Sequence, residues 1–150
     1  MKLWIQRVLS ASVDVGDERL SEIGRGFLIL LGVGRGDTPE TADRLAKRAV
    51  ALRIFEDAEG KTNLSVADVG GSVIVVSQFT LYADTAHGNR PGFSAAARPE
   101  LAVPLYESFV AHLRDELGAE RVQTGRCGAD MKVRLLNDGP FTVELLSASS

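Results

Sequence analysis

Two apolar runs that end abruptly in polar residues constrain this chain more than any other feature. Gly71–Val76 leads into Ser77-Gln78-Phe79-Thr80-Leu81, and Met131–Leu136 leads into Asn137-Asp138-Gly139-Pro140-Phe141-Thr142. Apolar runs of this length and composition are typical of strands that face a core. We therefore expect both polar segments to lie where a buried sheet meets solvent.

Alternating residues and short apolar runs predict a chain rich in strands. The turn Gly16–Glu18 should join the first two strands in a hairpin. Phe27–Val33 is almost wholly apolar, as in a strand that is covered on both faces. The expected strands are residues 2–15, 19–23, 27–33, 72–77, 121–124, 131–137 and 141–146.

Two helices complete the expected fold. The first begins after Thr38, a good capping residue, with Pro39 at its first position. The second covers Pro99–Leu117 and ends at Gly118, and Pro104 should either mark its start or kink it. Strands outnumber helices and do not alternate with them. We therefore expect an α+β fold with a mostly antiparallel or mixed sheet.

The composition is that of a globular protein. With 150 residues, of which 45% are hydrophobic and 25% charged, residues 1–150 should form one domain with a frayed tail at 147–150. The longest apolar run, Gly26–Gly34, is far below the roughly 20 residues that span a bilayer. Met1–Arg7 reaches a charged residue too soon for a signal peptide. We expect a cytoplasmic protein with no membrane partner.

The formal net charge of −3 bears on nucleic-acid binding. Proteins that grip a phosphate backbone usually carry a basic surface. We therefore expect no DNA partner, and an RNA ligand would have to be held locally, for example at one end. Arg90, Arg98 and Lys132 are candidates for such phosphate contacts, although each alone is also typical of a solvated surface charge.

The scarcity of cysteine and histidine excludes several kinds of site. Cys127 is the only cysteine, so no intramolecular disulfide can form. His87 and His112 are the only histidines, and their spacing fits no metal-binding pattern. We expect no metal, no cofactor and no catalytic set of the Ser-His-Asp or Cys-His kind.

The residue pattern alone leaves two interpretations for each polar segment. Ser77–Leu81 is either a strand exit whose polar residues cap the backbone, or a set of donors for the oxyanion of ester cleavage. Asn137–Thr142 contains the turn signal Gly-Pro and reads as a hairpin tip. Bonds to proline are cis in only about 5–6% of cases, so the pattern does not decide the isomer of Gly139-Pro140.

These segments resemble the signatures of the D-aminoacyl-tRNA deacylases. Ser77–Leu81 matches the SQxxL motif of that family, and Asn137–Thr142 matches its NxGPxT motif. The resemblance covers nearly the whole chain, in order and without large gaps. Further matching blocks are Gln6–Val8, Ala11–Val13, Arg53–Phe55, Asp57–Lys61, Asn63–Leu64, Arg90–Ser94 and Ala129–Met131.

The resemblance implies a homodimeric hydrolase with a β-barrel-like α+β fold and an active site at the subunit interface. It implies that Gly139-Pro140 has a cis bond and presents its carbonyls to the substrate's α-carbon in the partner's site. An L side chain would clash with that backbone, whereas a D side chain would point to solvent and glycine would also enter. The implied substrates are D-aminoacyl-tRNA and glycyl-tRNA mischarged on the tRNA for alanine.

The resemblance also implies how the residues act. A water molecule attacks the ester with help from the terminal ribose 2′-hydroxyl, while the protein supplies positioning and oxyanion donors. Thr80 as a covalent nucleophile is the weaker hypothesis. Arg7 is either an outward-facing strand residue or a brace for the partner's Gly139-Pro140 carbonyls. The implied catalytic residues are Ser77, Gln78, Phe79, Thr80, Gly139 and Pro140, and the substrate-binding residues are Arg7, Leu81, Met131, Asn137 and Cys127.

One position departs from the family pattern. The family has an aromatic residue four positions before the methionine that corresponds to Met131, and this chain has Cys127 there. Both residues would help to hold the terminal adenosine. We expect Cys127 to be a small buried hydrophobe with a packing role rather than a redox role.

Two other functions stay open. The chain could be a tRNA-end binding module without catalysis, or a structural dimerisation domain. The intact Ser77-Gln78 and Gly139-Pro140 pairs favour the enzyme, because a non-catalytic descendant would be free to lose both.

Overall fold

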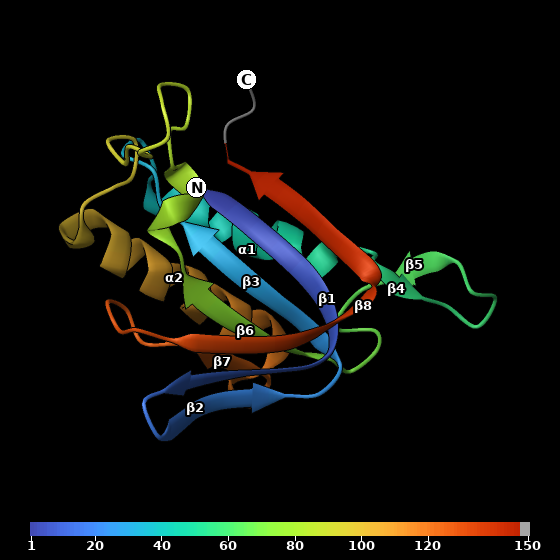
Figure 1. Cartoon of the computed structure of the whole chain (residues 1–150). Helices are drawn as coiled ribbons and strands as arrows, with labels where there is room; N and C mark the ends of the chain where they lie inside the picture. The colour runs from blue at the N-terminus through green and yellow to red at the C-terminus, as the bar shows by residue number, and fades with distance from the viewer. Residues whose placement is uncertain (148–150) are drawn as a thin grey trace.

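The computed structural model of the chain describes residues 1–147. A mixed sheet nearly closes into a barrel, and two helices cover one of its sides (Figure 1). The expected α+β fold with a mixed sheet is therefore confirmed. The elements are β1 (Lys2–Val15), β2 (Glu18–Ile23), β3 (Gly26–Gly32), α1 (Pro39–Ala51), β4 (Phe55–Glu56), β5 (Thr62–Leu64), β6 (Ser72–Ser77), the 3-10 helix η1 (Phe79–Tyr82), α2 (Pro99–Leu117), the 3-10 helix η2 (Ala119–Arg121), β7 (Val122–Thr124) and β8 (Lys132–Leu146).

The long strand β1 organises the sheet because it pairs with three other strands. Residues 2–8 of β1 are antiparallel to β3, and residues 11–15 are antiparallel to β2. Strand β8 runs antiparallel along both halves of β1. Parallel pairing then joins β3 to β6 and β6 to β7. Between β2 and β7 the Glu22 amide donates to Gln123 Oε1 at 2.8 Å, which brings the sheet close to closure.

Strands β3 and β6 are apolar on both faces because each face meets a different core. Successive side chains of a strand point to opposite faces of the sheet. Phe27, Ile29 and Leu31 of β3 pack in the core beneath α1 and α2, while Leu28 points into the barrel. The barrel core consists of Val8, Ala11, Val13, Ile23, Leu28, Ile74 and Val76.

Both helices begin where the sequence predicts. The Thr38 hydroxyl accepts from the Thr41 amide at 3.3 Å, and the Thr38 amide donates to Thr41 Oγ1 at 3.1 Å. Each side chain therefore provides a hydrogen-bond acceptor for the other residue's backbone N–H at the start of α1. Helix α2 begins at Pro99 and runs through Pro104, so a start at Pro104 is wrong. It ends at Gly118, whose φ of +96° favours glycine. In residues 1–147 neither helix combines the length and apolarity needed to cross a membrane.

The C-terminal region departs most from the predicted elements. Residues 131–137 and 141–146 form one strand, β8, and both halves pair with β1. The chain does not reverse, so the hairpin-tip interpretation of Asn137–Thr142 is wrong. Gln6 lies opposite Thr142 and Val8 lies opposite Asn137, so a step of two residues in β1 spans five in β8. The extra residues leave the sheet as a bulge, which we call the β8 bulge (residues 138–141).

Two smaller features also differ from expectation. The short strands β4 and β5 pair around the turn at Asp57–Gly60, and only the turn is predicted. In the expected frayed tail, the Ser147 amide donates to the Met1 carbonyl at 2.9 Å. Residues 148–150 lie outside the described part of the chain.

The core beneath the helices offers a test of the packing. Phe109 of α2 is fully buried there, so Phe109→Ala removes a ring that the surroundings cannot replace. We expect the free energy of unfolding to fall by about 3–5 kcal/mol in urea denaturation. Leu101→Ala is the matched control, because Leu101 is exposed on the same helix. Equal losses in the two variants would contradict the described core.

Candidate active site

The first signature segment lies where β6 leaves the sheet. Ser77 is the last residue of β6, and η1 begins two residues later. The Gln78 amide donates to the Leu31 carbonyl at 2.7 Å, so the exit is anchored to the end of β3. Two residues upstream, the buried Tyr106 hydroxyl of α2 donates to the Val75 carbonyl at 2.6 Å. The backbone on both sides of Ser77 is thus held in place.

Two glycines allow η1 to lie close against β3. A β-carbon on Gly32 would stand 3.1 Å from the Gln78 carbonyl oxygen and from Leu81 Cβ. A β-carbon on Gly34 would stand 2.8 Å from the Tyr82 hydroxyl oxygen. A larger residue at Gly32 would push η1 away from the sheet and move the amides that it carries, whereas one at Gly34 would displace the Tyr82 ring.

The start of η1 presents unused backbone donors. The first N–H groups of a helix have no acceptor within it. Among the contacts of residues 1–147, the amides of Phe79 and Thr80 have no hydrogen-bond acceptor, and both residues are exposed. Beside them, Gln78 Nε2 donates to Thr80 Oγ1 at 2.5 Å. Two adjacent N–H groups without an acceptor can stabilise a developing oxyanion.

Two cavities flank η1 and share Ser77, Phe79 and Gly128. The smaller, of about 310 Å³, also touches Gln78 and Met131. The larger, of about 610 Å³, extends along the start of α2. Both have sizes at which small-molecule sites occur. The structure thus brings together Ser77, Gln78, Phe79 and Met131, all of which the sequence predicts as site residues.

Met131 and Cys127 differ in how they border the site. Met131 Sδ accepts from the Arg126 amide at 3.4 Å, and a β-carbon on Gly125 would stand 2.5 Å from that sulfur. The methionine is therefore held against this turn. Cys127 is exposed at the larger cavity, so the prediction of a buried hydrophobe is wrong. Partial burial of its thiol raises the pKa, although Ser77 opposes the shift by hydrogen bonding.

The positions of the two histidines bear on whether a side-chain base is available at η1. His87 is in an exposed loop, and His112 Nδ1 lies 3.4 Å from Asp43 between α2 and α1. Neither lines the two cavities. Asp130, which lines the smaller one, is ion-paired with Lys132 at 3.2 Å. Across residues 1–147 no group of three or more His, Cys, Asp or Glu side chains is placed to hold a metal ion.

Arg7 braces the β8 bulge from inside the protein. Its side chain is buried, so the outward-facing interpretation is wrong. Arg7 Nε donates to the Asp138 carbonyl at 3.0 Å and Nη1 donates to the Ile54 carbonyl at 2.6 Å. The guanidinium also lies 4.7 Å from the centre of the Phe141 ring. One side chain therefore ties the bulge to the base of the β4–β5 hairpin within the same chain.

Asn137 closes the neck of the bulge. Its Nδ2 donates to the Arg7 carbonyl at 3.1 Å and to the Phe141 carbonyl at 3.0 Å, and its Oδ1 accepts from the Phe141 amide at 3.1 Å. At the exposed tip the Gly139-Pro140 bond is cis, as expected. Gly139 has a φ of +135°, and a β-carbon there would stand 3.0 Å from Arg7 Nη2. The tip backbone is thus both exposed and supported.

The two signature segments of one chain lie at different ends of the sheet (Figure 1). Arg7, which holds the bulge, is opposite Phe27, and Phe27 is opposite Val73. Ser77 is four residues further along β6, or about 13 Å at the usual rise per residue. The chain therefore does not place its own bulge beside its own η1.

Comparison with known proteins now decides the family. The profile of the D-Tyr-tRNA(Tyr) deacylase family matches residues 4–146. The D-aminoacyl-tRNA deacylase of Roseiflexus sp. strain RS-1 is 55% identical over 99% of this chain and 94% of its own. That of Marinobacter nauticus is 54% identical over 98% and 94%. The chain belongs to the D-aminoacyl-tRNA deacylase family.

Solved structures agree with the described fold. A structure described as c-Myc DNA Unwinding Element Binding Protein superposes with a TM-score of 0.94 at 42% identity, over 99% of this chain and 100% of that one. A probable eukaryotic D-amino acid tRNA deacylase superposes with a TM-score of 0.81 at 18% identity, over 96% and 97%. This second likeness shows the deacylase fold alone.

Sequence reasoning missed several residues of the candidate site. Gly32 and Gly34 shape η1, and the pattern Gly-x-Gly after an apolar strand could have indicated a close backbone approach. Phe93 packs edge-to-face on Phe79 at 5.1 Å, and it lies in a block that matches the family. Arg35 lines the larger cavity, and no signal in the sequence singles it out.

The brace on the β8 bulge can be tested by Arg7→Lys. An ammonium cannot donate to the Asp138 and Ile54 carbonyls in the two directions that the guanidinium uses. We expect the free energy of unfolding to fall by about 1–3 kcal/mol and the Phe141 amide to exchange faster with deuterium. Arg48→Lys, on the exposed face of α1, is the control. Unchanged exchange at Phe141 would show that Arg7 does not hold the bulge.

Proposed function

We propose that this deacylase hydrolyses the ester bond of D-aminoacyl-tRNA, releasing the D-amino acid and free tRNA, at a site that two copies of the chain complete. The observation that carries the proposal is the pair of unused amides at Phe79 and Thr80, of which Phe79 lines both cavities. They suit the oxyanion of ester cleavage, the chemistry for which the related proteins are named. The full-length likeness to those proteins supports the same substrate class.

Catalysis would rest on positioning rather than on a side-chain base. No histidine lines the cavities in the described part of the chain. We therefore assign the attack to a water molecule, with the substrate's ribose 2′-hydroxyl assisting and the Phe79 and Thr80 amides holding the oxyanion. Gln78 would orient the substrate, because its side-chain Nε2 donates to the Thr80 hydroxyl next to these two backbone amides. Ser77 and Leu81 would frame the site from either side.

Chiral selection would come from the bulge of a second copy. The exposed Gly139-Pro140 tip, held from behind by Arg7 and Asn137, would present rigid carbonyls to the substrate's α-carbon. An L side chain would collide with that backbone, and a D side chain would point away. Glycine carries no side chain to exclude, so glycyl-tRNA mischarged on the tRNA for alanine would also be a substrate.

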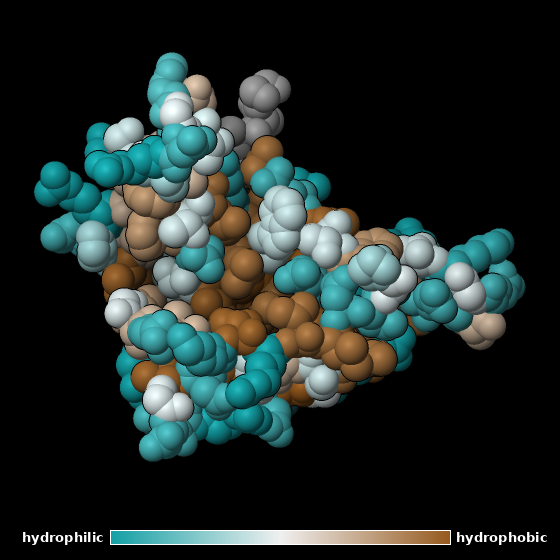
Figure 2. All heavy atoms as spheres, viewed as in Figure 1, coloured by the Kyte–Doolittle hydropathy of each residue, from teal (hydrophilic) through white to brown (hydrophobic). Residues whose placement is uncertain are grey.

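An exposed apolar face supports the homodimer. Trp4 and Leu9 of β1 and Leu136 of β8 are exposed by 38–55%. Figure 2 shows apolar side chains gathered across the middle of the face that β1 and β8 form. Apolar patches of this kind often mark interaction sites. A second copy that covers this face could bring its β8 bulge to η1.

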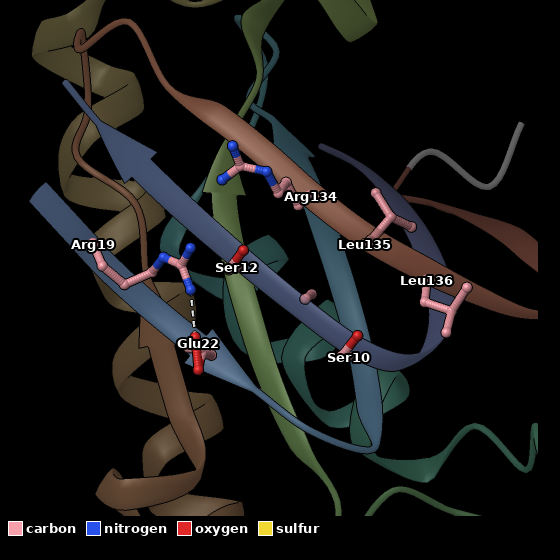
Figure 3. Close-up of a pocket in the computed structure, with 8 residues that line it drawn as sticks. Ser10, Ser12, Arg19, Glu22, Arg134, Leu135 and Leu136 are labelled. Atoms are coloured by element: carbon pink, nitrogen blue, oxygen red, sulfur yellow. Dashed lines mark hydrogen bonds and ion pairs between the residues drawn. The ribbon is translucent and has the colours of Figure 1, made fainter. Parts of the chain in front are cut away.

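Residues of β1, β2 and β8 also form a hollow that includes the exposed Leu136. It has a volume of about 370 Å³, with Ser10 and Ser12 between Leu136 on one side and the Arg19–Glu22 ion pair on the other (Figure 3). Small residues flanked by larger ones can receive a protruding side chain. We propose that this hollow is covered in the homodimer.

The setting that fits the proposal is the cytoplasm, with aminoacylated tRNA as the partner. The DNA-binding named for one structural relative is not carried over. With a net charge of −3 the chain lacks the basic character of most DNA-binding proteins.

The proposed function is tested by incubating the protein with matched D- and L-tyrosyl-tRNA, with a chelator present. We expect release of D-tyrosine, and release of L-tyrosine at least about 100-fold slower, a difference of about 2.7 kcal/mol in activation free energy. Thr80→Ala is the matched variant, because it keeps the amide and removes the hydroxyl. This variant should retain most of the D-tyrosyl-tRNA hydrolysis if the backbone amides, rather than the hydroxyl, stabilise the oxyanion.

Three other results would contradict the account. Equal release of D- and L-tyrosine would show that the site does not select between the two stereoisomers. Loss of all activity in Thr80→Ala would favour the covalent hypothesis. No release from either substrate, with tRNA binding retained, would identify a tRNA-end binding module without catalysis.

A further inference from the structure

We propose that the β4–β5 hairpin determines how strictly the β8 bulge excludes L-amino acids, and that Asn63 and Asp57 are positioning residues for this selection. The inference rests on the proposed function, because it takes the tip of the bulge as the chiral filter. Neither residue would touch the substrate. Both would act through the Ile54 carbonyl, to which Arg7 donates while it holds the bulge.

The hairpin lies beside the bulge but away from the cavities. It stands out from the body of the protein next to the bend of β8 (Figure 1). It contains three blocks that match the deacylase family, Arg53–Phe55, Asp57–Lys61 and Asn63–Leu64, and among residues 1–147 none of these lines the two cavities beside η1. Its carbonyl at Ile54 accepts a buried hydrogen bond of 2.6 Å from Arg7 Nη1. The hairpin can therefore influence the reaction through the bulge.

The Ile54 carbonyl matters because the cation that it binds is buried. Arg7 is 6% exposed, and its guanidinium donates to two carbonyls, that of Asp138 in the bulge and that of Ile54 at the hairpin. A buried charged donor that loses its acceptor pays the full cost of its desolvation. If the Ile54 carbonyl moves, the guanidinium must follow it or lose it, and either change weakens the hydrogen bond to the Asp138 carbonyl. The position of Ile54 thus helps to fix the bulge backbone.

The residues on both sides of Ile54 hold its carbonyl in place. Phe55 is fully buried, and its ring stacks on Phe27 with 6.0 Å between the ring centres. Arg53 is exposed and is held by Asn63 across the hairpin. Arg53 Nε donates to the Asn63 carbonyl at 2.9 Å, and Nη2 donates to the Asn63 side-chain oxygen. One flank of Ile54 is therefore fixed by the core, whereas the other depends on a single asparagine.

Asp57 orients the side chain of that asparagine. Asn63 Nδ2 donates to Asp57 Oδ2 at 3.2 Å, so the amide oxygen is turned toward Arg53. Asp57 Oδ1 accepts from the backbone amides of Lys61 and Glu59, each at 2.9 Å. The Lys61 amide, followed by the Glu59 amide and the Asn63 side chain, lowers the pKa of Asp57 and keeps it an acceptor. The turn of the hairpin is thereby connected to the carbonyl that supports the bulge.

The test exchanges the acid and the amide between the two positions. In Asn63→Asp two carboxylates would face each other, and in Asp57→Asn two amide NH2 groups would do so. In the double variant Asp57→Asn/Asn63→Asp, the bond between the two side chains reverses its direction, and the bonds from Arg53, Glu59 and Lys61 keep their acceptors. The exchange therefore preserves the network that each single change breaks.

The readout is the ratio of kcat/KM for D-tyrosyl-tRNA to that for L-tyrosyl-tRNA. We expect each single variant to lower this ratio about tenfold through faster hydrolysis of the L substrate, because a bulge that lacks one hydrogen bond of support yields more easily. The double variant should return to the wild-type ratio. In hydrogen–deuterium exchange, the Phe141 amide should exchange faster in the single variants and at the wild-type rate in the double variant.

Two controls separate positioning from a loss of stability. Phe109→Ala weakens the core beneath the helices, and below its melting temperature it should keep the wild-type ratio. Asp43→Asn removes the same charge from α1, where Asp43 pairs with Lys47 at 3.2 Å, and it should also keep that ratio. Thermal unfolding sets a temperature at which every variant is folded, and all ratios are measured there.

The outcomes separate the two proposals. A wild-type ratio in both single variants would overturn the inference, including the case in which hydrolysis of both substrates declines together, because the hairpin would then only stabilise the fold. A lowered ratio that the double variant does not restore would also overturn it, because the two side chains would not act as a pair. A wild-type protein without preference for the D substrate would instead contradict the proposed function.

Discussion

The pairing of β8 with β1 is the contact on which both the barrel and the site depend. It runs from one end of β1 to the other, and it covers the barrel core with the inward-facing residues of β8. The first of two register shifts in this pairing, between Gln6 and Val8, releases residues 138–141 from the sheet. The same ladder that stabilises the fold therefore also places the β8 bulge at the surface, with paired backbone on both sides of it.

A bulge can select between stereoisomers only if its backbone stays in place. Here three side-chain hydrogen bonds restrain it, one from Arg7 to the Asp138 carbonyl and two between Asn137 and the Phe141 amide and carbonyl. The buried guanidinium keeps both carbonyl partners, Asp138 and Ile54, and these offset the cost of removing its charge from water. The restraint is internal to one chain, whereas the proposed target, η1, belongs to the other. This division explains why a chain with both motifs would need a second copy to act.

Much of the fold follows from local sequence patterns. The parts that local patterns fail to predict depend on contacts between residues far apart in the sequence. The apolar runs of β3 and β6 and the cap at Thr38 predict their elements directly. The Gly139-Pro140 turn signal misleads, because pairing of both flanks with β1 overrides a local preference for reversal. The burial of Arg7 also escapes local reasoning, since its two acceptors lie 47 and 131 residues away in sequence. Cys127 looks like a core residue by type, but it lies on a turn.

The most direct test of a shared site is complementation between two inactive variants. Phe79→Pro removes an η1 amide at a position that tolerates proline, and Gly139→Val places a side chain against Arg7 at the bulge. If each site uses η1 of one chain and the bulge of the other, a refolded equimolar mixture should recover about a quarter of wild-type D-tyrosyl-tRNA hydrolysis, because half of the dimers are mixed and each has one intact site. A mixture as inactive as the separate variants, with mixed dimers shown to form, would contradict the account.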